Sequence, residues 1–225
     1  MHTLSTIPIY SEMYYKGREC TMGELDEVSE FLTGVKFSDK LEVAKLHGEI
    51  HLDKFFSKRI FYADIMYDLV DLKYDYEADM QGFGEAYEHT LSRKNDFFEY
   101  SNLYAKCILG KNEILHNLRD RYQAGDREYL MELCNVKLPE LVEDYKAFQK
   151  VYTKQWLKDS KGNGLEVMEV RLGGAILRLE TAKDRIKAYL NGDIDYIEEL
   201  EEKVIVGERP QYKEARKVMG TSFIW

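Results

Sequence analysis

The sequence predicts an all-α protein, built as a bundle of long antiparallel helices with shorter helices flanking it. Between Leu165 and Leu190, apolar residues recur at three- and four-residue steps, which places them on one face of a long helix. Only three prolines occur in 225 residues, which leaves room for long helices. Helix start and stop signals recur along the chain, and no internal repeat or low-complexity linker interrupts the pattern.

Composition and charge exclude several classes of function. The chain is 44% hydrophobic and 32% charged, which is typical of a globular protein. A net charge of -9 argues against a nucleic-acid partner, because phosphate binding needs a positive field. No apolar run approaches the ~20 residues of a membrane span, and the N-terminus lacks the features of a signal peptide. Cys20, Cys107 and Cys134 are odd in number and far apart, which indicates reduced thiols. We therefore expect a cytoplasmic protein that binds neither nucleic acid nor membrane.

Helix signals begin near the N-terminus. Residues 1–18 predict a short helix after Pro8. Thr21 and Glu24 have the spacing of a capping box, which starts a helix that Gly34 ends.

The next stretch is less regular. Ser38 or Asp39 is expected to cap a short helix that Gly48 closes. Residues 49–80 are dense in aromatics and aspartates and follow neither the helical nor the strand periodicity clearly. We expect a short helix from Lys58 followed by an irregular connection.

The middle of the chain is strongly helical. The pattern over residues 84–123 is too long for one typical helix, so we expect a break near residues 92–95. Gly125 can stop the second part, and Asp126 can cap the next helix. Pro139 can start a further helix or kink a continuing one.

The long helix from Leu165 is expected to end at Gly192, a natural left-handed stop, with Asp193 capping a last short helix through Leu200. Residues 206–225 form a tail with an apolar end.

Motifs that could carry catalysis or bind metal are weak. Glu113 and His116 have the Glu-x-x-His spacing of di-iron bundles, but the chain has no second copy, so a solvated helix face is the preferred interpretation. His47 and His51 are four residues apart without the metalloprotease order His-Glu-x-x-His. The adjacent carboxylates of Asp26 and Glu27 fall within a predicted amphipathic helix.

No serine elbow or Gly-rich phosphate loop occurs, and no cysteine stands in a catalytic context. We therefore predict no catalytic residue, no cofactor site and no metal site.

Packing or interface residues are better candidates. Gly173 and Gly174 stand inside a long helix, where each glycine costs roughly 1 kcal/mol against alanine, so close backbone packing is the expected compensation. Arg171 lies one turn earlier among apolar positions, and we expect it to meet a carboxylate of this chain or of a partner. Trp156 stands at a helix end beside a Gly-containing loop, where its ring could meet a partner surface. Most other aromatics are expected in the core rather than in a carbohydrate site.

These residues also carry a resemblance to a known family. The order of Trp156, a Gly-containing loop and a helix with Arg171-Leu172-Gly173-Gly174 is similar to the C-terminal helical domain of bacterial exo-β-N-acetylhexosaminidases of glycoside hydrolase family 20. Other blocks agree in order, namely Gly164–Val167, Arg178-Leu179, Glu198–Leu200, Ile9–Tyr15, Phe31–Gly34, Ser57-Lys58 with Tyr62, Asp64 and Leu69, and Tyr122 with Gly125, Asp126 and Leu130. The resemblance covers roughly residues 7–205.

The resemblance implies a parent enzyme that removes terminal β-linked N-acetylhexosamine by substrate-assisted catalysis. Its Asp-Glu pair belongs to a (β/α)8 barrel that this chain lacks, so no catalytic residue carries over, and Asp26-Glu27 does not match the motif. The family's helical domain is associated with homodimer formation. Residues 1–225 are then expected to be one helical accessory domain, with residues 1–20 as the segment that joins an N-terminal barrel. Trp156, Arg171, Gly173, Gly174 and Arg178 become the packing or interface candidates.

Two other hypotheses remain. The chain could be a stand-alone helical interaction module without enzymatic activity. It could also be a metal-dependent bundle enzyme, which would rest on Glu113 and His116. Reading the DNA upstream of codon 1 separates the first hypothesis from the accessory domain, and metal analysis tests the second.

Overall fold

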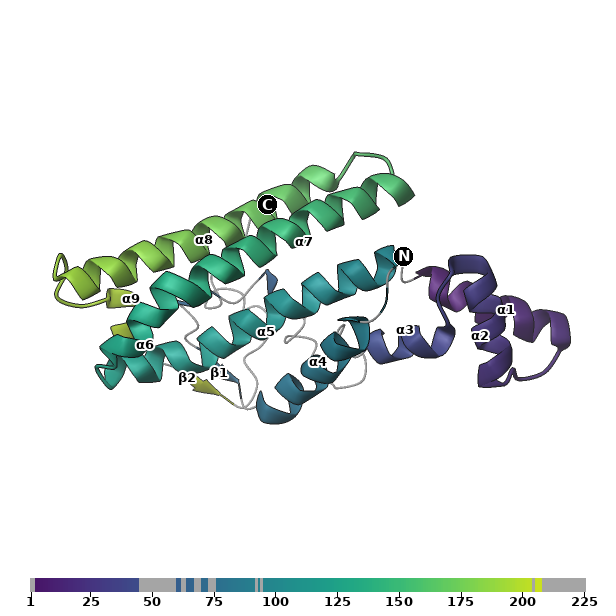
Figure 1. Ribbon diagram of the computed structural model, residues 1–225, viewed down its shortest axis with the longest axis horizontal. Helices are drawn as coiled ribbons and strands as arrows, with labels where there is room; N and C mark the ends of the chain where they lie inside the picture. The colour runs from purple at the N-terminus through teal and green to yellow at the C-terminus, as the bar shows by residue number, and fades with distance from the viewer. Residues whose placement is uncertain are drawn as a thin grey trace.

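The fold is all-α, as the sequence predicts (Figure 1). The computed structural model describes residues 3–44, 60–61, 64–66, 70–72, 76–91, 93, 95–203 and 205–207. Three long helices dominate it, α5 (Asp96–Gln123), α7 (Leu138–Asp159) and α8 (Leu165–Asn191). Shorter helices flank these three, and α4 (Tyr76–Leu91) packs on α5.

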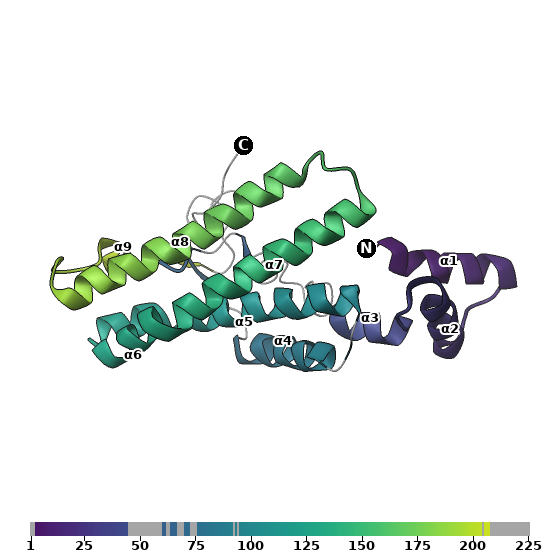
Figure 2. The same ribbon diagram turned by 45° about the horizontal axis from the view of Figure 1, so that its top comes forward.

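The long helices run antiparallel to their sequence neighbours. Ion pairs mark the register between α5 and α7, because Lys158 at the end of α7 reaches Asp96 at the start of α5, at 3.0 Å, while Lys137 reaches Glu113, at 2.6 Å. α7 and α8 lie side by side as a long hairpin in all three views (Figures 1 and 2). The break expected near residues 92–95 is confirmed, since α4 ends at Leu91 and the Asn95 side chain caps α5.

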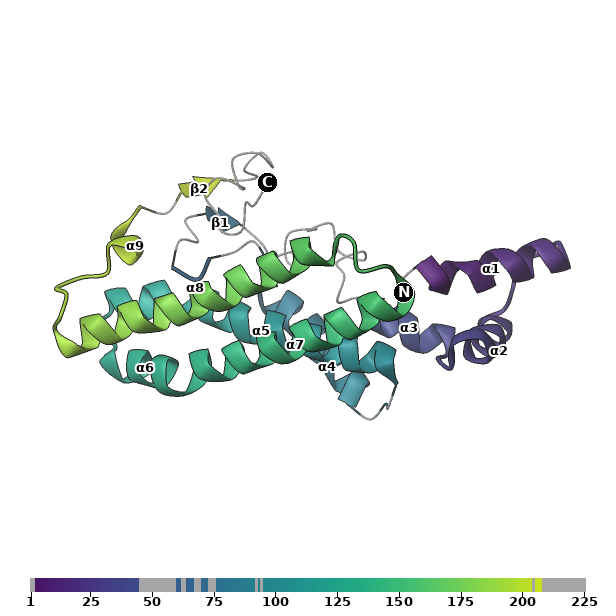
Figure 3. The same ribbon diagram turned by 90° about the horizontal axis from the view of Figure 1, so that it is seen from above.

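Three short helices lie at one end of the bundle (Figures 1 and 3). They are α1 (Thr3–Lys16), α2 (Met22–Thr33) and α3 (Phe37–Ala44). The capping box of Thr21 with Glu24 and the end of α2 at Gly34 are confirmed. The N-terminal helix starts at Thr3 rather than after Pro8, so Pro8 lies within it.

The start of α3 corrects one expectation. Neither Ser38 nor Asp39 is its cap, since α3 already begins at Phe37. The carboxylate of Asp26, on α2, accepts hydrogen bonds from the Ser38 backbone N–H, at 2.7 Å, and from its hydroxyl, at 2.9 Å. A neighbouring helix therefore supplies the acceptor that a local cap would have supplied. Gly48, the expected end of this helix, and Lys58 lie outside the described residues.

α6 (Arg127–Glu132) continues into α7 through a π-helical segment, η3 (Leu133–Lys137). The Asp126 side chain caps α6, as predicted. In the wide turn the Leu138 backbone N–H donates to the Leu133 carbonyl, five residues earlier. This turn directly precedes Pro139, whose ring has no N–H and would crowd the carbonyl four residues before it. Pro139 lies in the first turn of α7, which begins at Leu138, so of its two alternatives the start of a helix is the one observed.

The end of the long helix α8 follows the sequence, but the last helix does not. Gly192 adopts φ +80° after Asn191, as a left-handed stop requires. The last helix, α9 (Glu198–Glu201), is shorter than expected and follows Ile197, so Asp193 does not cap it. Ile197 and Leu200 are buried in the core, and their burial fixes the short turn in place of a cap.

The core lies between α4, α5, α7 and α8. One contiguous cluster of buried side chains fills it, including Tyr145 and Phe148 of α7 and Leu172, Leu179 and Ile186 of α8. Each large apolar side chain buried there stabilises the fold by about 1.5–3 kcal/mol.

A chain of ring contacts continues the core between α5 and α7, through Tyr100, Tyr104, Phe148, Tyr152 and Trp156. These aromatics pack against each other as core residues do.

Two three-residue strands form a small addition that the sequence did not predict. β1 (Val70–Leu72) pairs parallel to β2 (Ile205–Gly207), with Val70 opposite Ile205. Figure 3 shows the pair outside the row of long helices. Strands this short leave the fold class unchanged.

Candidate functional site

Trp156 closes the turn between α7 and α8. Its indole Nε1 donates to the Lys161 carbonyl at 2.8 Å, and its ring stacks on Tyr152 at 6.0 Å. Gly164 adopts φ +92° beneath the ring, and a Cβ there would lie 3.3 Å from the Trp156 ring. The tryptophan thus packs on its own loop and leaves one part of the ring accessible.

Arg171 is half-buried on α8. Its positive charge is close enough to the Tyr152 hydroxyl to influence the pKa of that phenol. Its Nε is buried and has no hydrogen-bond partner among the described residues. Burial is the main cause that raises the pKa of Tyr152, and the Arg171 charge opposes that effect. The carboxylate expected to pair with Arg171 is not found within 4.0 Å of it among the described residues.

Gly173 and Gly174 face open space within the described structure. A Cβ added at either glycine meets nothing within 4 Å among those residues. Gly174 lies on a stripe of α8 with Val167, Val170 and Leu177, which are exposed although apolar and are spaced three and four residues apart. This stripe, called the α8 stripe below, faces away from the core residues of the same helix.

Arg178 joins α8 to the segment before β1. Its Nε donates to Asp64 Oδ2 at 2.6 Å, and the Asp64 side chain is only 3% exposed. Asp64 Oδ1 also accepts the Met66 backbone N–H at 2.9 Å, which fixes the turn. The ion pair is therefore an internal link between two blocks that resemble the family, Asp64 and Arg178.

Two arginines that sequence reasoning missed complete this region. Arg119, on α5, donates to the backbone carbonyls of Leu200, at 2.6 Å, and Glu202, at 3.0 Å. Arg185, on α8, pairs with Glu199 at 2.7 Å, and this hydrogen bond helps to lower the pKa of Glu199 against the opposing effect of its burial. No local sequence pattern marks either arginine, because these partners are 14 to 83 residues away.

Tyr122 ties the same end of the molecule together. Its hydroxyl donates to Glu201 Oε1 at 2.8 Å and accepts the Ile197 backbone N–H at 3.0 Å. Burial raises the pKa of Tyr122, so the phenol remains protonated at neutral pH. The contacts of Arg119, Arg185 and Tyr122 hold α9 on the bundle. Arg119 binds backbone carbonyls, and Arg185 pairs with Glu199.

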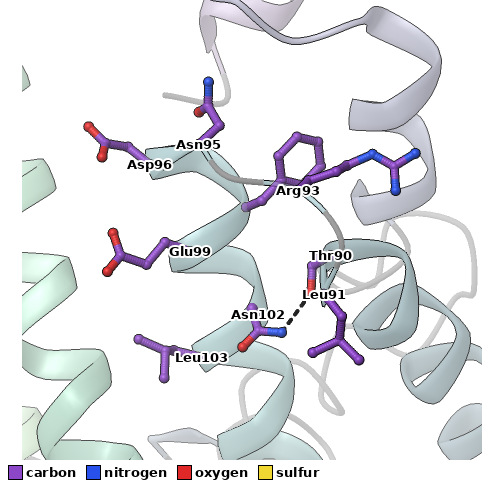
Figure 4. Close-up of a pocket in the computed structure, with 9 residues that line it drawn as sticks. Thr90, Leu91, Arg93, Asn95, Asp96, Glu99, Asn102 and Leu103 are labelled. Atoms are coloured by element: carbon purple, nitrogen blue, oxygen red, sulfur yellow. Dashed lines mark hydrogen bonds between the residues drawn. The ribbon is translucent and has the colours of Figure 1, made fainter.

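A groove of about 580 Å³ lies at the junction of α4 and α5 (Figure 4). Asp96 and Glu99 stand on its α5 side, and Arg93 stands across from them. Hydrogen bonds from Lys158 and Lys154 lower the pKa of Asp96, so this carboxyl is ionised at neutral pH and cannot serve as a general acid. Arg93 is engaged with Asp39 at 2.9 Å. Asp96 therefore does not supply the carboxylic acid that glycoside hydrolysis uses.

The other motifs occupy ordinary structural positions. Glu113 pairs with Lys137, and His116 is exposed. Asp26 caps α3, whereas Glu27 is exposed. Among the described residues, no three His, Cys, Asp or Glu side chains come together as metal ligands. His47 and His51 lie outside that part of the chain.

The three cysteines are free thiols. Burial raises the pKa of Cys107 and raises that of Cys134 to about 11, so both thiols stay protonated and unreactive at neutral pH. None of the helices in the described ranges is long and apolar enough to span a bilayer.

Comparison with known proteins identifies the family of this chain. No curated protein matches the chain. A family model described as the Glycoside Hydrolase 20C C-terminal domain matches residues 35–220, which is most of the chain. It includes Asp64, Arg178 and Glu199, the residues that join the bundle to α9 and to the turn at residues 64–66. The chain therefore belongs to the Glycoside Hydrolase 20C C-terminal domain family.

Proposed function

We propose that this chain is the non-catalytic helical accessory domain of a β-N-acetylhexosaminidase, and that it forms a homodimer. The match to a C-terminal domain family over residues 35–220 is the observation that carries the proposal, because a C-terminal domain of a family 20 enzyme implies a catalytic domain in the same parent. The parent would hydrolyse terminal β-linked N-acetylhexosamine on its barrel. We propose the cytoplasm as its compartment, in keeping with three unpaired thiols.

An activity assay tests the non-catalytic role. The purified chain should not release the chromophore from a chromogenic N-acetylglucosaminide, because Asp96 and Asp64 form ion pairs and Asp26 caps a helix, and none of them belongs to an acid/base pair. The same assay on the chain joined to the catalytic domain encoded with it should show turnover. Turnover by the isolated chain would overturn the proposal.

The α8 stripe supports the homodimer. Val167, Val170 and Leu177 are between 45% and 62% exposed, and a Cβ on Gly174, which lies among them, would meet no described residue within 4 Å. Two glycines in mid-helix cost roughly 1 kcal/mol each, and the described part of the chain offers no close contact that would offset this cost. A second copy of α8 packed on the stripe would offset it, since glycine lets two helix backbones approach closely.

Analytical ultracentrifugation of a Gly174→Leu variant tests this interface. We expect the dimer to weaken at least about tenfold, a loss of 1.4 kcal/mol or more, because the new side chain separates the two helices. Within the monomer, a Cβ at position 174 meets nothing within 4 Å among the described residues and leucine is the better helix former, so the free energy of unfolding measured under monomeric conditions should not fall.

Gly82→Leu is the matched control. Gly82 also lies inside a helix, α4, and a Cβ there also meets nothing within 4 Å among the described residues. This variant should sediment like the parent chain. A parent chain that stays monomeric across micromolar concentrations, or a Gly174→Leu variant that dimerises normally, would contradict the α8 interface.

A further inference from the structure

Exposed apolar side chains concentrate on α1 and α2. Tyr10, Tyr14 and Tyr15 of α1 are 72%, 94% and 88% exposed, and Phe31 of α2 is 88% exposed. Leu32 adds to them on α2. Tyr10 and Tyr14 are four residues apart and share one face of α1. Because α1 and α2 pack on each other, this many exposed rings on the two helices indicate an interaction site, whereas scattered single residues would need no explanation.

These rings are held on a fixed helical frame. Glu24, at the start of α2, accepts hydrogen bonds from Lys16, at 3.0 Å, and from Arg18, at 2.7 Å, which ties the end of α1 to α2. Behind them, Lys40 of α3 is buried and donates to Ser29 of α2 at 2.9 Å. The aromatic side chains therefore project from ordered helices, and a partner that covers them does not have to order the backbone first.

α1 and α2 are also set apart from the bundle. The contiguous core starts at Val35 and includes no described residue before it. The family match starts at the same residue. In Figures 1 and 3 both helices project from the end of the molecule opposite α6 and α9. The segment before Val35 thus contributes little to the core of this domain while it displays the most exposed aromatic rings.

We propose that the surface formed by Tyr10, Tyr14, Tyr15, Phe31 and Leu32 is the docking surface for the glycosidase catalytic domain that precedes a domain of this family. This inference rests on the proposed function and names its contact surface. It commits to the catalytic domain because the surface lies on the N-terminal side of a C-terminal domain, where the chain would leave the preceding domain.

The size and charge of the surface fit such a partner. Four large rings at this exposure offer roughly 500–800 Å², which is about one side of an ordinary domain interface. A membrane fits poorly, because the basic side chains described beside the rings, Lys16 and Arg18, are already paired with Glu24. A second copy of this chain is the remaining occupant, and the experiment separates it from the catalytic domain.

Calorimetric titration tests the proposal with the full chain and the family 20 catalytic domain encoded in the same genome, expressed as a separate protein. The Tyr14→Ser, Phe31→Ser double variant should bind at least thirtyfold more weakly, because buried aromatic rings dominate most interfaces. A Tyr10→Ser variant should weaken binding as well. The melting temperature of each variant should stay within about 2 °C of the parent, since these side chains lie outside the core.

Tyr196→Ser is the control, because Tyr196 is 59% exposed on the turn between α8 and α9. It should bind like the parent. If the parent chain binds and the double variant binds equally well, the docking surface is wrong while the proposed function stands. If the parent chain does not bind, or if no such catalytic domain is encoded, both are wrong. If the double variant loses self-association instead, the surface belongs to a second copy and the inference is overturned.

Discussion

Single residues hold together parts of this chain that are far apart in sequence. Asp64 and Arg178 are separated by 114 positions and meet at 2.6 Å. The Asp64 carboxylate is almost fully buried and also fixes the turn through the Met66 N–H. A buried carboxylate in such a site depends on its partners, because it has lost its water.

Asp64→Ala should lower the free energy of unfolding by about 2–3 kcal/mol, since it removes the 2.6 Å ion pair with Arg178 and frees the turn. Urea unfolding gives the value. Asp144→Ala is the control, because Asp144 pairs with the half-exposed Lys106 and should cost under about 1 kcal/mol. Equal losses for the two variants would show that the Asp64 pair is no stronger than a surface pair.

The backbone conformation at position 164 and the neighbouring Trp156 ring both require glycine there. It adopts φ +92°, and a Cβ would meet the Trp156 ring at 3.3 Å. Gly164→Ala should therefore lower the free energy of unfolding by roughly 2 kcal/mol through backbone strain and displacement of the ring.

Gly162→Ala, two residues earlier, is the matched control for thermal unfolding. A Cβ there meets only Leu157, at 3.8 Å, and its φ is not positive. It should be within about 0.5 kcal/mol of the parent. A red-shifted tryptophan emission in Gly164→Ala alone would confirm that the ring has moved, and unchanged emission and stability would contradict its packing role.

At the scale of elements, the sequence determined helices wherever local signals were strong. α8, the capping box of α2 and the cap of α6 all follow from residues within one turn of the helix end. The sequence predicted the starts of α3 and α9 less accurately, because the Asp26 cap of α3 and the burial of Ile197 before α9 depend on contacts outside the local sequence. Contacts of this kind have no local pattern.

The contact between α1 and α2 should depend on pH. The Arg18 guanidinium foremost, then the Thr21 N–H and Lys16, hold the pKa of Glu24 well below its usual range. A carboxyl with a depressed pKa stabilises the fold above its unfolded pKa of about 4.3, and this stabilisation is lost as the pH falls below that value.

Hydrogen exchange should therefore show weaker protection of residues 9–16 in Glu24→Gln than in the parent at pH 7, with the difference shrinking steadily as the pH falls below about 4. Glu27→Gln is the control, because Glu27 is exposed on the same helix. A difference as large in acid as at pH 7, or one absent at pH 7, would contradict the ion-pair origin of the contact.

At the scale of the molecule, the core and the family match both begin at Val35. α1 and α2 contact the rest through polar links, such as Lys40 with Ser29, more than through shared core. The bundle should accordingly be a folding unit without them.

A chain that starts at Val35 should keep cooperative urea unfolding because the contiguous core is retained, but with a lower midpoint, because α3 loses the Asp26 cap and the buried Lys40 loses Ser29. Removing residues from the start of α8 instead, up to Leu172, should abolish the transition, since it deletes Leu165 and Leu172 from the buried interior. Loss of cooperativity in the first variant would show that α1 and α2 belong to the folding unit.

The candidate site was predicted only in part. The sequence drew attention to Gly173 and Gly174 because mid-helix glycine is costly whatever its surroundings. It could not say whether the compensating contact was internal, and the structure places open space beside both within the described residues. Arg119 and Arg185 gave no signal, because an arginine that will bind distant carbonyls looks like any surface arginine.

The sequence by itself determined the all-α class, the long helix of residues 165–191 and the family resemblance, because periodicity, caps and ordered motifs are properties of neighbouring residues. The tertiary structure decided which charges became links, as with Asp64 and Arg178, and which apolar side chains stayed outside, as with Tyr14 and Phe31. The physical reason is that burial and pairing depend on which distant segments meet, and helical periodicity gives the face of a helix without naming its partner.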